Sequence, residues 1–187
     1  LPDGDRAFVV PDAGVEGVAE TELARVHAEG FFEAVIPGRD TVFRYMLRKV
    51  MKDGTEATFH DSYAFLPTVT DFDRYLFNAG THHRAYEKLG AHLTEVDGIG
   101  GIQFAVWAPG ARSVSVIGDF NDWDRRSHAM RALGSSGIWE IFIPGLPEGV
   151  LYKYQVKTQT GLIMDKADPY AFEMEVRPRT AARVNLL

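Results

Sequence analysis

The sequence predicts an all-β fold in which two tandem β-sandwich modules are joined by a short helical linker. Three observations support this prediction: the two halves of the chain resemble one another, each half shows strand periodicity, and helical periodicity is confined to the segment between them. We assign residues 1–68 to an N-terminal β-sandwich module truncated at its start, residues 69–90 to the linker and residues 91–187 to the second β-sandwich module.

Composition excludes several classes of protein. With 187 residues, of which 45% are hydrophobic and 25% charged, the chain is long enough for two small cores. The formal net charge of −6 and the absence of a basic run argue against nucleic acid as a partner. No apolar run approaches the roughly 20 residues of a membrane span. The lack of cysteine fits a reducing compartment, so we expect a cytoplasmic protein with no membrane partner.

The first module begins with Leu1-Pro-Asp-Gly4, a turn sequence that normally connects two strands. We therefore expect the chain to be a fragment whose N-terminus has been cut.

The two copies match in three places. The matching segments are 29–38 with 136–145, 43–45 with 152–154 after a two-residue slip, and 61–65 with 168–172. Gly30 and Gly137 lie 107 positions apart (137 − 30).

Upstream of these segments the spacing changes. Pro11 and Pro109 follow similar sequences but lie only 98 positions apart (109 − 11). This alignment makes the second copy nine residues longer there (107 − 98), and the extra length falls at residues 118–126. We therefore expect the first copy to lack the loop that contains Trp123.

Within each copy, side chains alternate as they do in half-buried strands. Tyr152 and Tyr154 face one side of residues 151–157 while Lys153 faces the other, and we expect Tyr45 to hold the inward position equivalent to Tyr154. Several short strands bounded by Gly and Pro are typical of an immunoglobulin-like sandwich.

The linker has a short helical pattern. Thr70 can cap a helix with Asp73 three residues later, and Gly80 can end it. The linker histidines give no metal site, because the adjacent His82 and His83 point in different directions on a helix.

Trp123 is the candidate binding residue. It lies in a loop rich in Gly, Asp and Asn directly after an alternating strand, which exposes the indole at one end of a sandwich. A flat indole beside amide and ammonium donors binds the apolar face of a pyranose ring, and Asn121 and Lys153 are the candidate donors. The alternative is that Trp123 caps the sandwich and Asn121 serves the turn. For Trp107 and Trp139 we expect packing roles.

The sequence shows no catalytic constellation. The aspartates 119, 122 and 124 lack the ligand spacing of an EF-hand loop, and a glycosidase carboxylate pair needs a cleft for which a small sandwich has little room. Phosphate-loop, nucleophile-elbow and zinc-protease motifs are absent. We therefore expect no catalytic residue, no metal and no cofactor.

Several segments resemble a known family. Residues 116–123, 146–149 and 152–154 resemble the carbohydrate-binding module of family 48, which glycogen-branching and debranching enzymes share with the regulatory β subunit of AMP-activated kinase. Residues 73–92 and 166–172 are similar to bacterial 1,4-α-glucan branching enzymes. The resemblance implies that Trp123 stacks on glucose units, that Asn121 and Lys153 hydrogen-bond them, and that an α-amylase-type (β/α)₈ barrel in the parent enzyme holds the catalytic carboxylates.

One departure from the family predicts weak binding. Strong glycogen binders carry a second tryptophan shortly after the glycine that corresponds to Gly161, whereas Leu162, Ile163 and Met164 follow here. A single aromatic platform suggests millimolar affinity, about −4 kcal/mol.

Two functions follow as hypotheses. The leading one is a non-catalytic region of a glycogen branching enzyme that binds α-1,4-glucan chains, supports the catalytic barrel and has no activity alone. The alternative is a protein-interaction module that docks the barrel or another partner without binding sugar.

Overall fold

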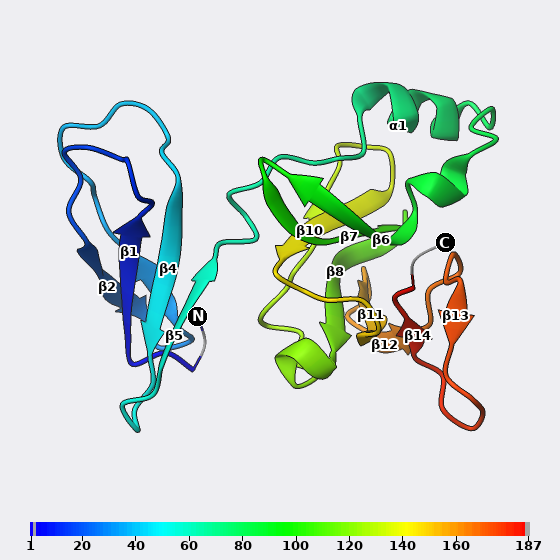
Figure 1. Cartoon of the computed structure of the whole chain (residues 1–187). Helices are drawn as coiled ribbons and strands as arrows, with labels where there is room; N and C mark the ends of the chain where they lie inside the picture. The colour runs from blue at the N-terminus through cyan, green and yellow to red at the C-terminus, as the bar shows by residue number, and fades with distance from the viewer. Residues whose placement is uncertain (2, 186–187) are drawn as a thin grey trace. The chain divides into compact units, whose positions relative to one another are not determined.

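The computed structural model describes residues 1 and 3–185, and the chain divides into two compact units, Leu1–Ala64 (unit 1) and Phe65–Leu187 (unit 2). Strands dominate both units, and α1 (Asp71–Asn78) is the single α-helix of the described residues (Figure 1). The prediction of an all-β chain is confirmed.

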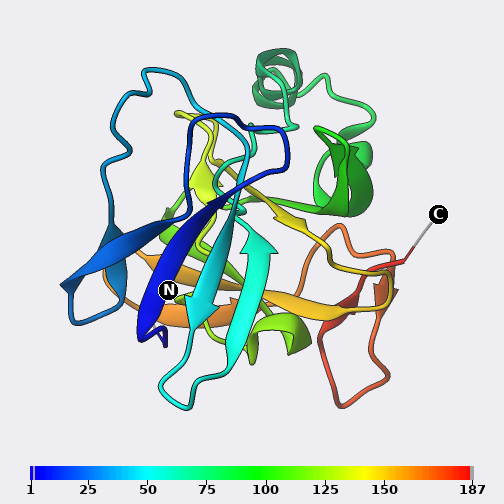
Figure 2. The same cartoon turned by 60° about the vertical axis from the view of Figure 1, so that its left-hand side comes forward.

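Unit 1 is one antiparallel sheet with the strand order β3-β2-β1-β4-β5, whose strands lie side by side in Figure 2. The strands are β1 (Arg6–Pro11), β2 (Thr21–His27), β3 (Phe31–Glu33), β4 (Tyr45–Val50) and β5 (Glu56–His60). On one face of this sheet the guanidinium carbons of Arg6 and Arg48 lie 4.9 and 4.0 Å from the centroid of the Phe8 ring. Because the described strands form a single sheet, the sandwich form of unit 1 stays a prediction.

Unit 2 contains two sheets. Their strands are β6 (Gly90–Val96), β7 (Ile99–Trp107), β8 (Ala111–Gly118), β9 (Arg131–Ala132), β10 (Ile138–Pro144), β11 (Leu151–Thr158), β12 (Ile163–Lys166), β13 (Glu173–Met174) and β14 (Ala182–Arg183). One sheet has the order β6-β7-β10-β9, and the other the order β12-β11-β14-β13 with β8 also paired to β11.

The two sheets of unit 2 share one buried core. Alternate residues of β7, such as Ile102 and Phe104, join Val116 of β8 and Tyr152 and Tyr154 of β11 in a single apolar cluster. The rings of Phe104 and Tyr152 meet edge to face with centroids 5.0 Å apart. This is the sandwich that the strand alternation predicts.

The predicted linker covers the outer face of the sheet that contains β7. Val69 and Leu89, which flank the helical segment, are buried with Ala105, Leu133 and Ile138 in a second apolar cluster, against which Phe77 of α1 packs. Because Ala105 lies between Phe104 and Val106 of the sandwich core, β7 is buried on both faces.

The helix ends follow the sequence signals. Asp73 N–H donates to Thr70 Oγ1 at 3.1 Å while Thr70 N–H donates to Asp73 Oδ2 at 3.0 Å, which is a reciprocal capping box. At the other end Gly80 adopts φ +70°, and Thr81 N–H donates to Leu76 O at 2.9 Å. The predicted start and end of this helix are confirmed.

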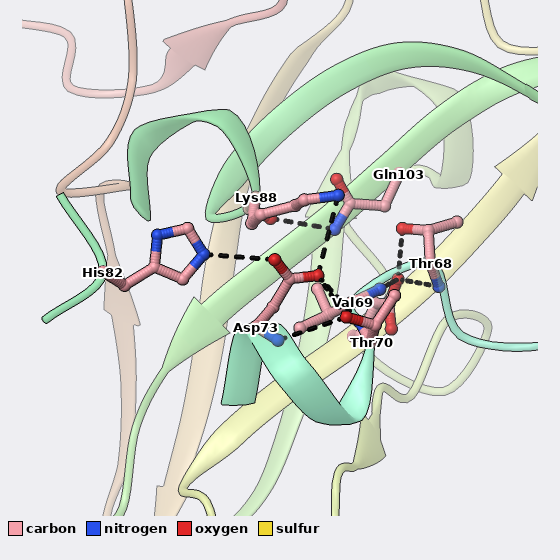
Figure 3. A network of polar contacts seen from close by, with 8 residues as sticks. Thr68, Val69, Thr70, Asp73, His82, Lys88 and Gln103 are labelled. Carbon is pink, nitrogen blue, oxygen red and sulfur yellow. Dashed lines mark hydrogen bonds and ion pairs between the residues drawn. The ribbon is translucent and has the colours of Figure 1, made fainter. Parts of the chain in front are cut away.

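A polar network holds this segment on the sheet (Figure 3). The carboxylate of Asp73 lies 3.2 Å from His82 Nε2 and 3.6 Å from Lys88 Nζ, and Gln103 Nε2 donates to the carbonyl of Lys88 at 3.1 Å. Buried Glu140 of β10 accepts from the N–H and the hydroxyl of Thr68, both at 2.7 Å. Side chains of β7 and β10 thus fix both ends of the helical segment.

The strand pairings of the structure correct the sequence alignment of the two copies. Each pair of neighbouring strands in unit 1 has an equivalent pair in unit 2, and equivalent residues always lie 107 positions apart. The matching partners are Phe8–Glu22 with Ser115–Ala129, Val9–Leu47 with Val116–Tyr154, Arg25–Phe32 with Ala132–Trp139, and Leu47–Phe59 with Tyr154–Lys166 (for example 154 − 47). The counterpart of β1 is therefore β8. The described sheet of unit 1 therefore corresponds to β8–β12.

Two expectations about the repeat are therefore wrong. Tyr45 is the counterpart of Tyr152 and not of Tyr154, because the ladders need no two-residue slip. Unit 1 also does not lack the loop that contains Trp123, since residues 12–17 correspond to residues 119–124 without an insertion. Pro11 and Pro109 do not occupy equivalent positions. Pro11 lies in β1, whose counterpart is β8, whereas Pro109 precedes β8.

A tyrosine–aspartate pair recurs at this offset. Tyr45 donates to Asp61 Oδ2 at 2.7 Å, and Tyr152 donates to Asp168 Oδ2 at 2.6 Å. In both units Oδ1 of the aspartate accepts the backbone N–H of the tyrosine two residues after it. Asp61 accepts from Tyr63 at 2.9 Å, and Asp168 accepts from Tyr170 at 2.8 Å. Burial raises the pKa of Asp168, so its hydrogen-bond donors are needed to keep it charged.

Removing one donor from Asp168 is expected to destabilise unit 2. Tyr152→Phe keeps the packed ring but leaves a buried carboxylate with one donor fewer, at a cost of about 1–3 kcal/mol. All three tryptophans lie in unit 2, so urea unfolding followed by tryptophan fluorescence reports on this unit.

Tyr45→Phe is the matched control, because it removes the equivalent bond from unit 1. It should leave the fluorescence midpoint unchanged. Equal midpoint losses in both variants would contradict separate roles for the two pairs.

Candidate functional site

The loop after β8 forms a compact turn that includes a 3₁₀ turn at Asp119–Asn121. Gly118 leaves no room for a side chain, because a Cβ there would lie 2.2 Å from Leu151 O. Asp119 Oδ1 accepts the N–H of Leu151 at 3.2 Å. The base of the loop is therefore tied to the start of β11.

Asn121 closes the loop with its side-chain amide. Its Oδ1 accepts the N–H of Gly118 at 2.9 Å, and its Nδ2 donates to Val116 O at 3.0 Å and lies 2.9 Å from His128 Nδ1. Both N–H groups of the amide are thus engaged within the loop. This geometry favours the interpretation that Asn121 serves the turn.

Trp123 is held outward by a strained backbone. Its φ is +58° and that of Asp122 is +53°, a left-handed conformation that costs a residue with a side chain about 1–2 kcal/mol. Trp123 N–H donates to Gly118 O at 2.9 Å, which closes the turn. The side chain is 40% exposed. Strain that places a large exposed aromatic residue is typical of binding sites.

Lys153 lies beside the base of this loop. It pairs across the ladder with Ile117, the residue before Gly118, and it alternates with the inward-facing Tyr152 and Tyr154. Its side chain is half-buried. The strand pairing therefore brings Lys153 to the same end of unit 2 as the loop that contains Trp123.

The sequence analysis did not identify His128, which contacts Asn121 and Phe120 of the loop. Its ring lies edge to face with Phe120, with centroids 5.6 Å apart, and Phe120 in turn stacks on Phe104 of the core. Burial lowers the pKa of His128 to about 4. The two backbone contacts of Asn121 fix its amide, so His128 Nδ1 must act as an acceptor in a neutral ring. No motif spacing marks this histidine.

A second aspartate of the loop also has an internal partner. Asp124 pairs with the guanidinium of Arg126, with Nε 2.8 Å from Oδ2. No group of three metal-ligating side chains is found among residues 1 and 3–185. Over the same residues, no helix is long and apolar enough to cross a membrane.

Of the two other tryptophans, Trp139 packs as expected, whereas Trp107 is only partly covered. Trp139 packs against the sandwich core and donates through Nε1 to Ala108 O at 3.1 Å. Trp107 is 51% exposed and lies 5.9 Å from the ring of Phe77, centroid to centroid.

Substitution of Trp123 by glycine should leave unit 2 as stable as the parent to within about 1 kcal/mol, because glycine tolerates positive φ. Trp123→Ala keeps the backbone strain and should be no more stable than Trp123→Gly. Urea unfolding followed by the fluorescence of the remaining tryptophans measures both variants.

Trp139→Ala is the comparison for a packing role, with an expected loss of about 3 kcal/mol. A loss of similar size in Trp123→Gly would show that the Trp123 indole supports the fold.

Lowering the pH should reduce the free energy of unfolding of unit 2, because the neutral ring of His128 becomes protonated. The folded-state pKa of about 4 lies below the ordinary value of 6.5, so the stability that the neutral ring provides is present above about pH 6.5 and is lost as the pH falls towards 4. Asp168 acts in the opposite sense, because its raised pKa favours the folded state at low pH. The difference between the parent and His128→Gln, measured as unfolding free energy against pH, isolates the contribution of His128.

The parent should lose more stability than His128→Gln between pH 7 and pH 4.5. His83→Gln, at an exposed position, should retain the parent profile. Parallel profiles for the parent and His128→Gln would rule out the proposed role of the neutral ring.

Two family descriptions match the chain, one in each unit. Residues 88–171 match carbohydrate-binding module 48 (isoamylase N-terminal domain), and residues 1–63 match the N-terminal domain of the alpha-1,4-glucan branching enzyme GlgB. Among solved structures, ligand-free PulA from Klebsiella pneumoniae aligns over 99% of this chain and 20% of its own, with a TM-score of 0.44 and 19% identity. That likeness is too low to support a conclusion.

Curated relatives are far more similar in sequence. A 1,4-alpha-glucan branching enzyme GlgB from Thermosynechococcus vestitus is 51% identical over 185 residues, which are 98% of this chain and 23% of the relative. The protein of that name from Trichormus variabilis is 49% identical over 190 residues, 100% of this chain and 24% of its own. The chain thus spans about a quarter of the length of the relatives it matches. With a GlgB N-terminal domain in unit 1 and a carbohydrate-binding module 48 in unit 2, the chain belongs to the 1,4-α-glucan branching enzyme family.

Proposed function

We propose that this chain binds α-1,4-glucan chains at the loop that contains Trp123 and is a non-catalytic binding and scaffold region of a glycogen branching enzyme. The observation that carries the proposal is the left-handed, 40% exposed Trp123 in a loop whose Asp119, Asn121 and Asp124 are engaged internally. The match of residues 88–171 to carbohydrate-binding module 48 supports the same ligand class.

In this proposal the indole of Trp123 stacks on a glucose ring. The C–H face of the sugar covers the exposed side chain, and the ring hydroxyls project to the sides, where a cation can donate to them. Lys153, at the base of the loop, supplies that charge-assisted hydrogen bond. Asn121 acts through the loop, because its two N–H groups are already bonded to Val116 and His128.

We expect the affinity for short glucans to be low. Leu162 and Ile163 follow Gly161, and both are exposed apolar side chains that offer no aromatic ring. A single stacked ring with one charged donor is consistent with millimolar dissociation constants, about −4 kcal/mol.

The scaffold part of the proposal concerns the remaining length of the parent. The relatives are about four times as long as the matched region, and we place glucan transfer and the catalytic barrel in that remainder. At the proposed glucan site Asp119 and Asp124 are bonded to Leu151 and Arg126, which supports a binding role for the loop.

The glucan site predicts a loss of retention on glycogen when Trp123 is removed. In native gels with and without glycogen, Trp123→Ala should lose most of the retardation of the parent chain, because the stacking surface is gone. Lys153→Ala should weaken retention by about 1 kcal/mol, the contribution of one hydrogen bond to a charged group.

Trp107→Ala is the matched control, since Trp107 is also a half-exposed indole of unit 2 but lies beside α1. It should retain the parent's retardation. Unchanged retardation in Trp123→Ala would refute the assigned site. A parent chain with no retardation at all would favour the protein-docking alternative.

One surface supports a docking role alongside glucan binding. Phe72 and Tyr75 of α1 are 66% and 67% exposed, which is unusual for aromatic side chains on a helix that is otherwise fixed to the sheet. We propose that this face of α1 contacts another domain of the parent enzyme.

A further inference from the structure

Unit 1 has a pocket of its own at the end of β1 and the start of β4. Its volume is about 580 Å³, and it is lined by Asp12, Ala13, Gly14, Val15, Glu16, Arg39, Phe43 and Arg44. The pocket is open to solvent, so it can accept part of a longer chain.

The pocket lies at the position that corresponds to the candidate site of unit 2. At the constant offset of 107, residues 12–16 are the counterparts of residues 119–123, and Arg44 is the counterpart of Leu151 (151 − 44). Glu16 stands where unit 2 has Trp123, so the loop itself supplies no aromatic ring here.

The aromatic surface comes instead from the segment before β4. Phe43 is half-buried, with its ring edge to face with Tyr45 at 6.0 Å between centroids. The guanidinium carbon of Arg39 lies 5.9 Å from the Phe43 centroid, and Arg39 Nη2 donates to the carbonyl of Glu16. Arg39 therefore bridges the loop and the aromatic ring across the pocket.

The charges of the lining indicate a neutral ligand. Arg39 and Arg44 are balanced by Asp12 and Glu16, so the pocket has no net charge to attract an anion. Asp12 Oδ1 is a buried acceptor with no hydrogen-bond partner within the described residues. A buried acceptor without a donor is uncommon in proteins, and a hydroxyl donor satisfies it where a phosphate oxygen would be repelled. The turn at residues 13–16, directly beside Asp12, is largely exposed.

An aromatic ring flanked by guanidinium donors and a carboxylate acceptor suits a neutral polyhydroxylated ring. We infer that the pocket of residues 12–16 and 39–44 is a second glucan-binding site, which contacts one or two glucose units through Phe43, Arg39 and Asp12. This inference rests on the proposed function only for the class of ligand, since its residues are distinct from the Trp123 site.

The test is a titration of the isotopically labelled 187-residue chain with maltoheptaose, followed through backbone amide resonances. Amides of residues 12–16 and 39–44 should shift in a saturable way, in addition to those of residues 119–124. Trp123→Ala should abolish the shifts at 119–124 and leave those of unit 1. Arg39→Ala and Phe43→Leu should each raise the dissociation constant measured in unit 1 at least threefold and leave the constant of the Trp123 loop unchanged.

Arg25→Ala is a closely matched control. Arg25 is exposed, donates to the carbonyl of Ala28 at 2.7 Å and lies 5.8 Å from the Phe32 centroid, so it repeats the contacts of Arg39 outside the pocket. Its removal should change neither constant. Retained resonance dispersion in each variant shows that the fold is intact.

Three results would overturn the inference. Shifts at residues 119–124 without shifts in unit 1 would refute the second site and leave the proposed function standing. Shifts of residues 12–16 and 39–44 with inorganic phosphate, but not with maltoheptaose, would assign an anion site instead. An equal effect of Arg25→Ala and Arg39→Ala would show that the pocket plays no specific part.

Discussion

The hydrogen bond from Tyr152 to Asp168 is the contact on which the fold of unit 2 depends most. It joins β11, the strand that pairs with β8, β12 and β14, to the segment that follows β12. Tyr154 extends the contact to the other sheet, because its hydroxyl lies 3.2 Å from Asp168 Oδ2 and also 3.2 Å from Gly90 O. One buried carboxylate thus connects the two layers of the sandwich where apolar packing alone would allow them to slide.

The candidate site is an extension of the same strand pair. β8 ends at Gly118, directly opposite Tyr152, and the loop begins there. Two side chains of the loop accept backbone N–H groups of these strands: Asn121 accepts from Gly118, and Asp119 accepts from Leu151. A rigid base of this kind lets the backbone hold Trp123 at positive φ, since the surrounding bonds outweigh a local cost of about 1–2 kcal/mol. Trp123 is therefore exposed on a loop whose Asp119 and Asn121 are bonded to the ends of β11 and β8.

Strand periodicity and helix capping were sufficient to predict the fold class, because both are local properties of the sequence. The alternation around Tyr152 and the pairing of Thr70 with Asp73 could be read directly. Strand register could not be read in the same way: aromatic-basic-aromatic triplets occur at 43–45 and at 152–154, and only the ladders show that Tyr45 matches Tyr152. At the site, the motif identified Trp123, whereas the engagement of Asn121 with His128 depends on a contact seven residues away in an irregular loop.

The burial of β7 on both faces determines where this module can be divided. One face of β7 belongs to the sandwich core, and the other is covered by the segment that begins at Phe65 and contains α1. A sandwich excised at residue 91 would expose the apolar groups of Ala105, Leu133 and Ile138 to water. The stable unit is therefore the sandwich together with its helical cover, and a boundary placed at residue 91 would favour aggregation over folding.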